Sequence, residues 1–87
     1  MTPLTMPKSA TRDNPPVQIS AAARAAGVSK QTIEYYILLG LIDPLRRGEH
    51  QRRYFDDELI RRIRLIRQLN ESGYTLRSIR ETYLRGK

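Results

Sequence analysis

Two short helical patterns separated by one glycine constrain the fold of this chain more than any other feature. The first is the alanine-rich run of residues 21–26, with Ser20 as the expected N-cap and Gly27 as the expected stop, because alanine has the highest helix propensity and glycine suits a left-handed C-cap. The second covers residues 30–39, follows Ser29 as its N-cap, and ends before another glycine. Small side chains on the first helix let the two helices cross closely. The spacing therefore predicts a helix-turn-helix.

The second of these helices has two chemically different sides. A helical projection puts Ile33, Tyr36 and Ile37 on the inner side, where only the hydroxyl of Tyr36 comes near the rim. The outer side and its flanks carry side chains that suit base edges and phosphates: Lys30, Gln31, Thr32, Glu34 and Tyr35. Tyr36 joins them as a candidate nucleic-acid contact, as do Ser20 and Ser29 at the two predicted helix starts. An ordinary solvated helix face is the alternative interpretation of the outer side.

A basic segment centred on Gly48 follows these helices. Turn chemistry replaces helical periodicity in the stretch LRRGEHQRRYF, residues 45–55. Four arginines against Glu49 leave a charge of +3 within eight residues. The stretch predicts a hairpin or loop that projects outward as a wing. Its candidate contacts to nucleic acid are Arg46, Arg47, Arg52, Arg53 and Tyr54.

Two further helices are expected after the wing. The acids at residues 56–58 suit the positive end of a helix dipole, and apolar residues recur at helical spacing over residues 59–69. Thr75 then caps a last helix. The apolar positions of that helix are Leu76, Ile79 and Tyr83. Residues 1–16, which hold four of the five prolines, predict a disordered arm. We therefore expect an all-α, mainly helical fold with four helices and a small wing, in one domain over residues 17–87.

The charge balance narrows the class of partner. The chain has 16 Lys and Arg against 9 Asp and Glu, a net charge of +7, and 13 of its cations are arginine. Such a charge on 87 residues favours a polyanion, either nucleic acid or an acidic membrane surface, and arginine suits bidentate contacts to phosphate and guanine. No stretch approaches the roughly 18 apolar residues of a membrane span. We expect a cytoplasmic, nucleoid-associated protein without a membrane partner.

Few residues could support catalysis or metal binding. The chain has no cysteine, which excludes disulfides and thiolate metal sites. His50, the only histidine, lies in the basic segment without an obvious nucleophile partner, so a loop residue near phosphate is the preferred interpretation. The acids at residues 56–58 favour helix capping over a metal site, and no glycine-rich phosphate loop is present. We therefore expect no enzyme activity and no cofactor.

Three stretches of the chain occur in the order that characterises one protein family. They are ISAAARAAGVSKQTIEYYILLGLIDPLRR, QRRYFDDEL and IRQLNESGYTLRSI, and together they cover about residues 18–84. This order resembles the DNA-binding domain of the MerR family of transcription regulators. The resemblance implies a winged helix-turn-helix whose second helix enters the major groove and whose wing grips the adjacent backbone. The positions that match the family's recognition-helix and R-x-Y wing motifs are Thr32, Tyr35, Tyr36, Arg52 and Tyr54.

Glu34 departs from the family's pattern, which usually has arginine at that position. A carboxylate cannot anchor a phosphate, because like charges repel. Two roles remain for Glu34: an ion pair that orients Arg52 or Arg53 of the wing, or acceptance of a hydrogen bond from a cytosine. The two residues before Arg52 replace a glycine and an aromatic residue of the family, so the family does not predict the shape of the wing tip.

The resemblance ends with the last predicted helix. In the family, a coiled-coil helix and an effector domain follow it, whereas this sequence stops at Lys87. We therefore expect neither a small-molecule effector site nor the family's usual dimerisation helix. Three oligomeric arrangements stay open: a monomer that pairs on DNA, a dimer formed by the last helix, or a fragment whose missing region dimerises.

The expected function is sequence-specific binding of double-stranded DNA in transcription. RNA polymerase at the promoter and a second copy of the chain on DNA are candidate partners. An excisionase-like factor that bends DNA for recombination shares this fold and is one alternative, which a neighbouring integrase gene would favour. A protein-interaction module is the other alternative. Its candidate residues are Arg61, Arg62, Arg64 and Arg67, for which a solvated helix face is the simpler interpretation.

Overall fold

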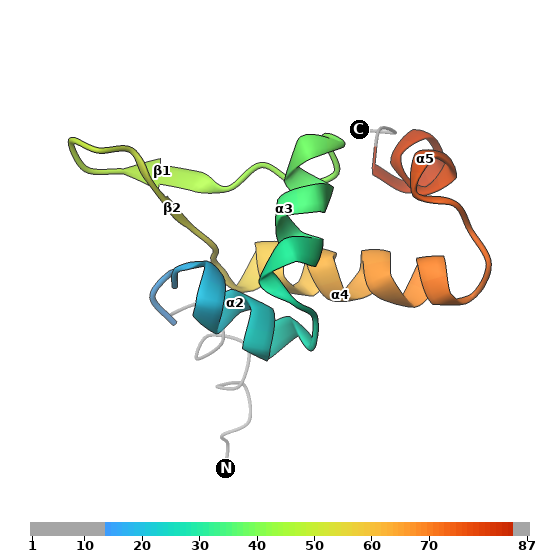
Figure 1. Ribbon diagram of the computed structural model, residues 1–87, viewed down its shortest axis with the longest axis horizontal. Helices are drawn as coiled ribbons and strands as arrows, with labels where there is room; N and C mark the ends of the chain where they lie inside the picture. The colour runs from blue at the N-terminus through green and yellow to red at the C-terminus, as the bar shows by residue number, and fades with distance from the viewer. Residues whose placement is uncertain (1–13, 85–87) are drawn as a thin grey trace, which may run out of the picture.

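The computed structural model describes residues 14–84. Its helices are α2 (Ile19–Ala26), α3 (Lys30–Leu38), α4 (Asp57–Glu71), α5 (Leu76–Ile79) and the π-helical segment η1 (Arg80–Leu84). An antiparallel hairpin of β1 (Leu45–Arg47) and β2 (Arg52–Tyr54) lies between α3 and α4 in sequence. Figure 1 shows this hairpin projecting away from the helices, with α5 at the opposite end of the molecule. The described residues thus form a mainly helical fold with a hairpin as the predicted wing, and the expected all-α class is approximate.

One apolar core joins the helices to the base of the hairpin. Small alanines on α2 let this helix pack closely against both α3 and α4. The apolar stripes of α3 and α4 fill the space beside them, and Phe55, directly after β2, is fully buried. The buried apolar side chains are Ala22, Ala23, Ala26, Ile33, Tyr36, Leu41, Ile42, Phe55, Ile63, Ile66 and Ile79. No charged side chain within residues 14–84 is buried, so hydrophobic burial is the main stabilising term of this core.

The N-caps predicted at Ser29 and Thr75 are confirmed, and Asp56 is the one of the three acids at residues 56–58 that caps its helix. The Ser29 hydroxyl accepts a hydrogen bond from the Thr32 backbone N–H (3.0 Å), which starts α3. Asp56 Oδ1 accepts from the Leu59 N–H (2.9 Å) at the start of α4, and the Thr75 hydroxyl caps α5 in the same way. Each cap satisfies one backbone donor that the first turn of a helix leaves free.

The predicted N-cap of the first helix is wrong. Ser20 is the second residue of α2, and Gln18 occupies the N-cap position without a side-chain hydrogen bond. Val17 is held extended by paired backbone hydrogen bonds to Phe55, with N···O distances of 3.0 and 2.7 Å. Because this bridge fixes the chain just before Gln18, the helix begins at Ile19, and tertiary pairing outweighs the capping preference of serine.

The ends of the chain are described only in part. Residues 1–13 of the predicted arm and residues 85–87 lie outside the described residues, as does the side chain of Tyr83. Of the arm's last three residues, Asn14 donates a hydrogen bond to Asp57 on α4 (3.2 Å). Each helix within residues 14–84 is too short or too polar to span a membrane.

Candidate nucleic-acid interface

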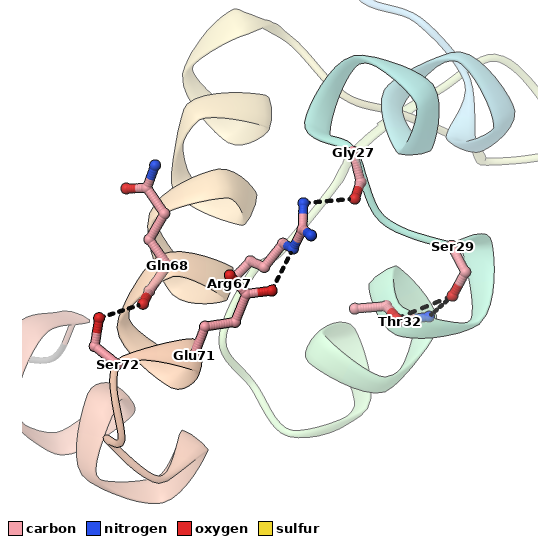
Figure 2. A network of polar contacts seen from close by, with 7 residues as sticks. All are labelled: Gly27, Ser29, Thr32, Arg67, Gln68, Glu71 and Ser72. Carbon is pink, nitrogen blue, oxygen red and sulfur yellow. Dashed lines mark hydrogen bonds and ion pairs between the residues drawn. The ribbon is translucent and has the colours of Figure 1, made fainter.

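The turn before α3 is fixed by Gly27 and by the cap of α3. Gly27 adopts a left-handed conformation (φ +74°) that ends α2, and the N–H of Val28 bonds to the Ala23 carbonyl (3.0 Å). In Figure 2, Ser29 and Thr32 lie side by side after this turn, and their hydroxyls are 2.9 Å apart. Thr32 is therefore tied to the cap, which orients the first turn of α3.

The outer side of α3 is exposed as the helical projection predicts. Lys30, Gln31 and Glu34 are exposed, and Tyr35 is 51% exposed. Leu38, one turn after Glu34, is 78% exposed; the helical projection also places it on this side, but the sequence reasoning did not count it as a candidate contact. Its signal was its spacing of four residues from Glu34, which places it on the same side of the helix. This side offers polar groups and one apolar side chain to a groove.

Tyr36 lies in the core with only 4% of its surface exposed. Burial raises the pKa of its hydroxyl, since the charged form would lose hydration. Its ring supports α3 from within, as the projection predicts. A phosphate contact through its hydroxyl stays a prediction.

The hairpin presents four arginines in two opposed pairs. Its register places Arg46 opposite Arg53 and Arg47 opposite Arg52. Successive strand residues point to opposite faces, so one arginine pair lies on each face of the ribbon. Gln51 closes the tip: its backbone N–H bonds to the Gly48 carbonyl (3.1 Å), and its own φ is +53°.

Glu34 of α3 and Arg53 of β2 form a two-point ion pair. Arg53 Nη1 donates to Glu34 Oε1 (2.9 Å), and Nη2 donates to Oε2 (2.7 Å). These hydrogen bonds, and then the charge of Arg53, lower the pKa of Glu34 against the opposing effect of desolvation. The ion pair predicted for Glu34 is thus present, and it selects Arg53 because Arg52 lies on the other face of the ribbon. Contact with a cytosine stays a prediction.

The other face of the hairpin borders a hollow of about 400 Å³. Arg47, Arg52 and Tyr54 line it from the strands, and Glu49 and His50 line it from the tip. Within residues 14–84, neither of the two arginines forms an ion pair. This face therefore carries two arginines beside one carboxylate, Glu49, which lies beyond ion-pair distance of both.

Arg67 links α4 to the turn between α2 and α3, which the sequence reasoning did not predict. Its Nη1 donates to the Gly27 carbonyl (2.8 Å), and its Nε donates to Glu71 Oε2 (2.9 Å). Figure 2 shows the guanidinium reaching from α4 to the end of α2. A carbonyl at a helix C-terminus attracts a cation, but no local pattern marks a contact across 40 residues of sequence.

Two acidic residues at the start of α4 have different partners. Asp56 caps it, and Asp57 accepts the hydrogen bond from Asn14. Across residues 14–84, no three His, Asp or Glu side chains come together in a group that could hold a metal ion. The geometry therefore supports capping as the role of Asp56.

Comparisons with known proteins agree with this arrangement. The Mercuric resistance operon regulatory protein of Bacillus cereus is 37% identical over 62 residues, which are 71% of this chain and 47% of that protein. Heavy metal-dependent transcription regulator 2 of Rhizobium meliloti is 32% identical over 65 residues, 75% of this chain and 44% of that protein. The putative heat shock protein HspR of Streptomyces coelicolor is 37% identical over 76 residues, 85% of this chain and 49% of that protein.

The matched segments span less than half of each of these relatives. The family model described as MerR HTH family regulatory protein matches residues 17–85, which is most of the chain. With its two helices joined at Gly27 and its basic hairpin, this chain belongs to the MerR family of helix-turn-helix regulatory proteins.

Proposed function

We propose that this protein is a sequence-specific regulator of transcription that binds double-stranded DNA. Its α3 enters the major groove, and its hairpin lies on the adjacent phosphate backbone. The observation that carries the proposal is the Glu34–Arg53 pair, because a contact of 2.7 Å brings the basic hairpin beside the exposed side of α3. A base-contacting helix and a phosphate-contacting ribbon thus share one surface, as a winged helix-turn-helix on DNA requires.

The side chains divide between bases and backbone. Gln31 suits bidentate contact with adenine, Lys30 suits guanine or phosphate, and Leu38 suits the methyl group of thymine. On the backbone, the exposed wing arginines and the hydroxyls at the helix starts suit phosphate oxygens. These backbone candidates are Ser20, Ser29, Tyr35, Arg46, Arg47, Arg52 and Tyr54.

Regulation of transcription is supported by the family and by the names of two relatives. A regulatory protein of a mercuric resistance operon and a heavy metal-dependent transcription regulator both match most of this chain. These names favour regulation over the recombination alternative. RNA polymerase and a second copy of the chain on DNA are the partners that such a role implies, because dimers read operators with two-fold symmetry.

Selection of bound duplexes from a random pool, followed by titration of the chain with the selected duplex, tests the proposal. We expect tighter binding to the selected duplex than to a scrambled one of the same composition. Equal affinity for the two duplexes would contradict sequence-specific regulation. Recovery of a protein partner without any DNA binding would instead favour the protein-interaction module.

A matched pair of variants then tests the helix assignment. Gln31→Ala on α3 is expected to lose about 1 to 3 kcal/mol of discrimination at one base pair. Gln68→Ala makes the same change on α4 and should leave that preference unchanged. Equal effects of the two variants would contradict the placement of α3 in the groove.

A further inference from the structure

The hairpin is a weak element by itself. Each strand has three residues, and a lone two-stranded hairpin is marginal in water. Two of its three cross-strand pairs oppose arginine with arginine, and like charges placed opposite each other destabilise a ribbon. Its position must therefore depend on contacts with the rest of the fold.

Two such contacts are made by hydrogen bonds in the described part of the chain. At the base, Val17 pairs with Phe55 through two backbone hydrogen bonds. Along one face, Glu34 holds Arg53 through both carboxylate oxygens. The first contact anchors the end of β2, and the second ties the ribbon directly to the exposed side of α3. Beside the buried Leu41 and Ile42 that lead into β1, the angle between helix and ribbon thus depends on this ion pair.

The ion pair contributes too little to folding stability to explain its two-point geometry. The side chains of Arg53 and Glu34 are 30% and 51% exposed, and such a pair contributes about 0 to 1 kcal/mol to folding. The two parallel N–H···O bonds nevertheless set both distance and orientation, as a single contact from lysine would not. The pair also occupies both terminal guanidinium nitrogens of Arg53, which are the donors that a two-point phosphate contact needs.

We propose that the Glu34–Arg53 pair is a positioning clamp that withholds Arg53 from the DNA backbone and fixes the spacing between α3 and the hairpin. The inference rests on the proposed function. Glu34 is then a positioning residue: it acts through Arg53 and touches no base. In the clamp, Arg53 makes no phosphate contact, although such a contact would strengthen binding to every duplex equally. In return, the base contacts of α3 and the backbone contacts of the hairpin keep a fixed spacing.

The test compares Glu34→Gln with the unmodified chain on the selected and scrambled duplexes across a salt series. Loss of the carboxylate frees Arg53 for phosphate, so the slope of log K against log salt should steepen by about 0.9 on both duplexes. Affinity for the scrambled duplex should rise. The preference for the selected duplex should fall by about three- to fivefold, which corresponds to the upper part of the energy range of an exposed ion pair.

Three further variants isolate the clamp from charge alone. Arg53→Ala should lower the preference without steepening the slope, because no freed cation remains. The exchange Glu34→Arg with Arg53→Glu restores an ion pair and should recover most of the preference. Glu81→Gln removes the same charge from the Arg77–Glu81 pair of α5 and η1, in which both side chains are exposed, and should leave the preference unchanged. Circular dichroism of each variant checks that it is folded.

The outcomes separate the clamp from the proposed function. An unmodified chain without preference for any duplex would overturn both. A clear preference that Glu34→Gln leaves unchanged, together with an unchanged slope, would overturn the clamp alone. A change of preference confined to one base pair, again with an unchanged slope, would assign Glu34 to direct base contact and also overturn the clamp.

Discussion

Gly27 and Gly48 share a left-handed backbone conformation, with φ of +74° and +81°, in different surroundings. A Cβ at Gly27 would lie 3.1 Å from Arg67 Nη1, whereas a Cβ at Gly48 would meet no atom within 4 Å. Left-handed backbone costs an L-residue about 1 to 2 kcal/mol at either position. At Gly27, alanine must also displace the donor to its own carbonyl.

We therefore expect Gly27→Ala to lower the free energy of unfolding by about 2 kcal/mol, of which roughly half comes from the disturbed hydrogen bond. Gly48→Ala is the matched control with the same backbone requirement, and it should cost only the backbone part, about 1 kcal/mol, because a Cβ there would meet no atom within 4 Å. Urea unfolding measures both values. Equal losses would contradict a structural role for the Arg67–Gly27 contact.

The ion pair of Glu34 predicts how the free energy of unfolding depends on pH in the acid range. Its pKa is lowered in the folded chain by the hydrogen bonds from Arg53. A lowered folded pKa contributes stability above the unfolded value, near 4.3 for glutamate, and that contribution disappears as pH falls through the folded value. Unfolding free energy measured from pH 6 downward should thus fall less steeply in Glu34→Gln than in the unmodified chain. Glu49→Gln, at the exposed hairpin tip, is the control, and an equal flattening in that variant would contradict the argument.

At the scale of elements, Arg67 joins α4 to the turn that leads into α3. A hydrogen bond to a backbone carbonyl contributes about 0.5 to 1.5 kcal/mol net, or more when the donor is charged. Arg67→Met keeps the apolar stem and removes the donor, so we expect unfolding free energy to fall by about 1 kcal/mol. Arg64→Met, on an exposed part of the same helix, should change it by less than about 0.5 kcal/mol. Equal effects in thermal or urea unfolding would show that Arg67 is only a solvated residue.

The elements that the sequence predicts correctly are those whose signals are local. The two sides of α3 follow from helical periodicity, and Ser29, Asp56 and Thr75 cap helices because each cap bonds a donor three residues away. The prediction of Ser20 as an N-cap is wrong because the deciding contact is not local. Its helix start is decided by the Val17–Phe55 bridge, which joins residues far apart in sequence.

The same distinction between local and long-range signals explains which parts of the candidate site the sequence predicts. Periodicity and charge identify the basic hairpin and the outer side of α3, and the need to partner a lone carboxylate predicts an ion pair for Glu34. The choice between Arg52 and Arg53 depends on which face of the ribbon turns toward α3, and that follows only from the hairpin register. The Arg67–Gly27 contact likewise depends on how α4 packs against α2.

At the scale of the molecule, only some of the positively charged side chains are available to bind a polyanion. Of the 16 cations in the sequence, Arg53 and Arg67 are committed to contacts within the fold, and Arg77 lies 3.6 Å from Glu81. The proposed interface uses Lys30, Arg46, Arg47 and Arg52, which are exposed and form no ion pair within residues 14–84. Net charge attracts the chain to any polyanion, but counterion release counts only the cations that reach phosphates.

The salt dependence of DNA binding measures how many cations do so. Four contacts predict a slope of about −3.6 for log K against log salt on the selected duplex. Arg47→Gln in the hairpin should reduce the magnitude of that slope by about 0.9, whereas Arg61→Gln on α4 makes the same charge change and should leave it unaltered. If Arg61→Gln reduced the slope as much as Arg47→Gln, α4 would contribute to the DNA contact and the proposed surface would be too small. A slope that followed the net charge in both variants alike would show that the whole molecule, rather than one face of it, faces the DNA.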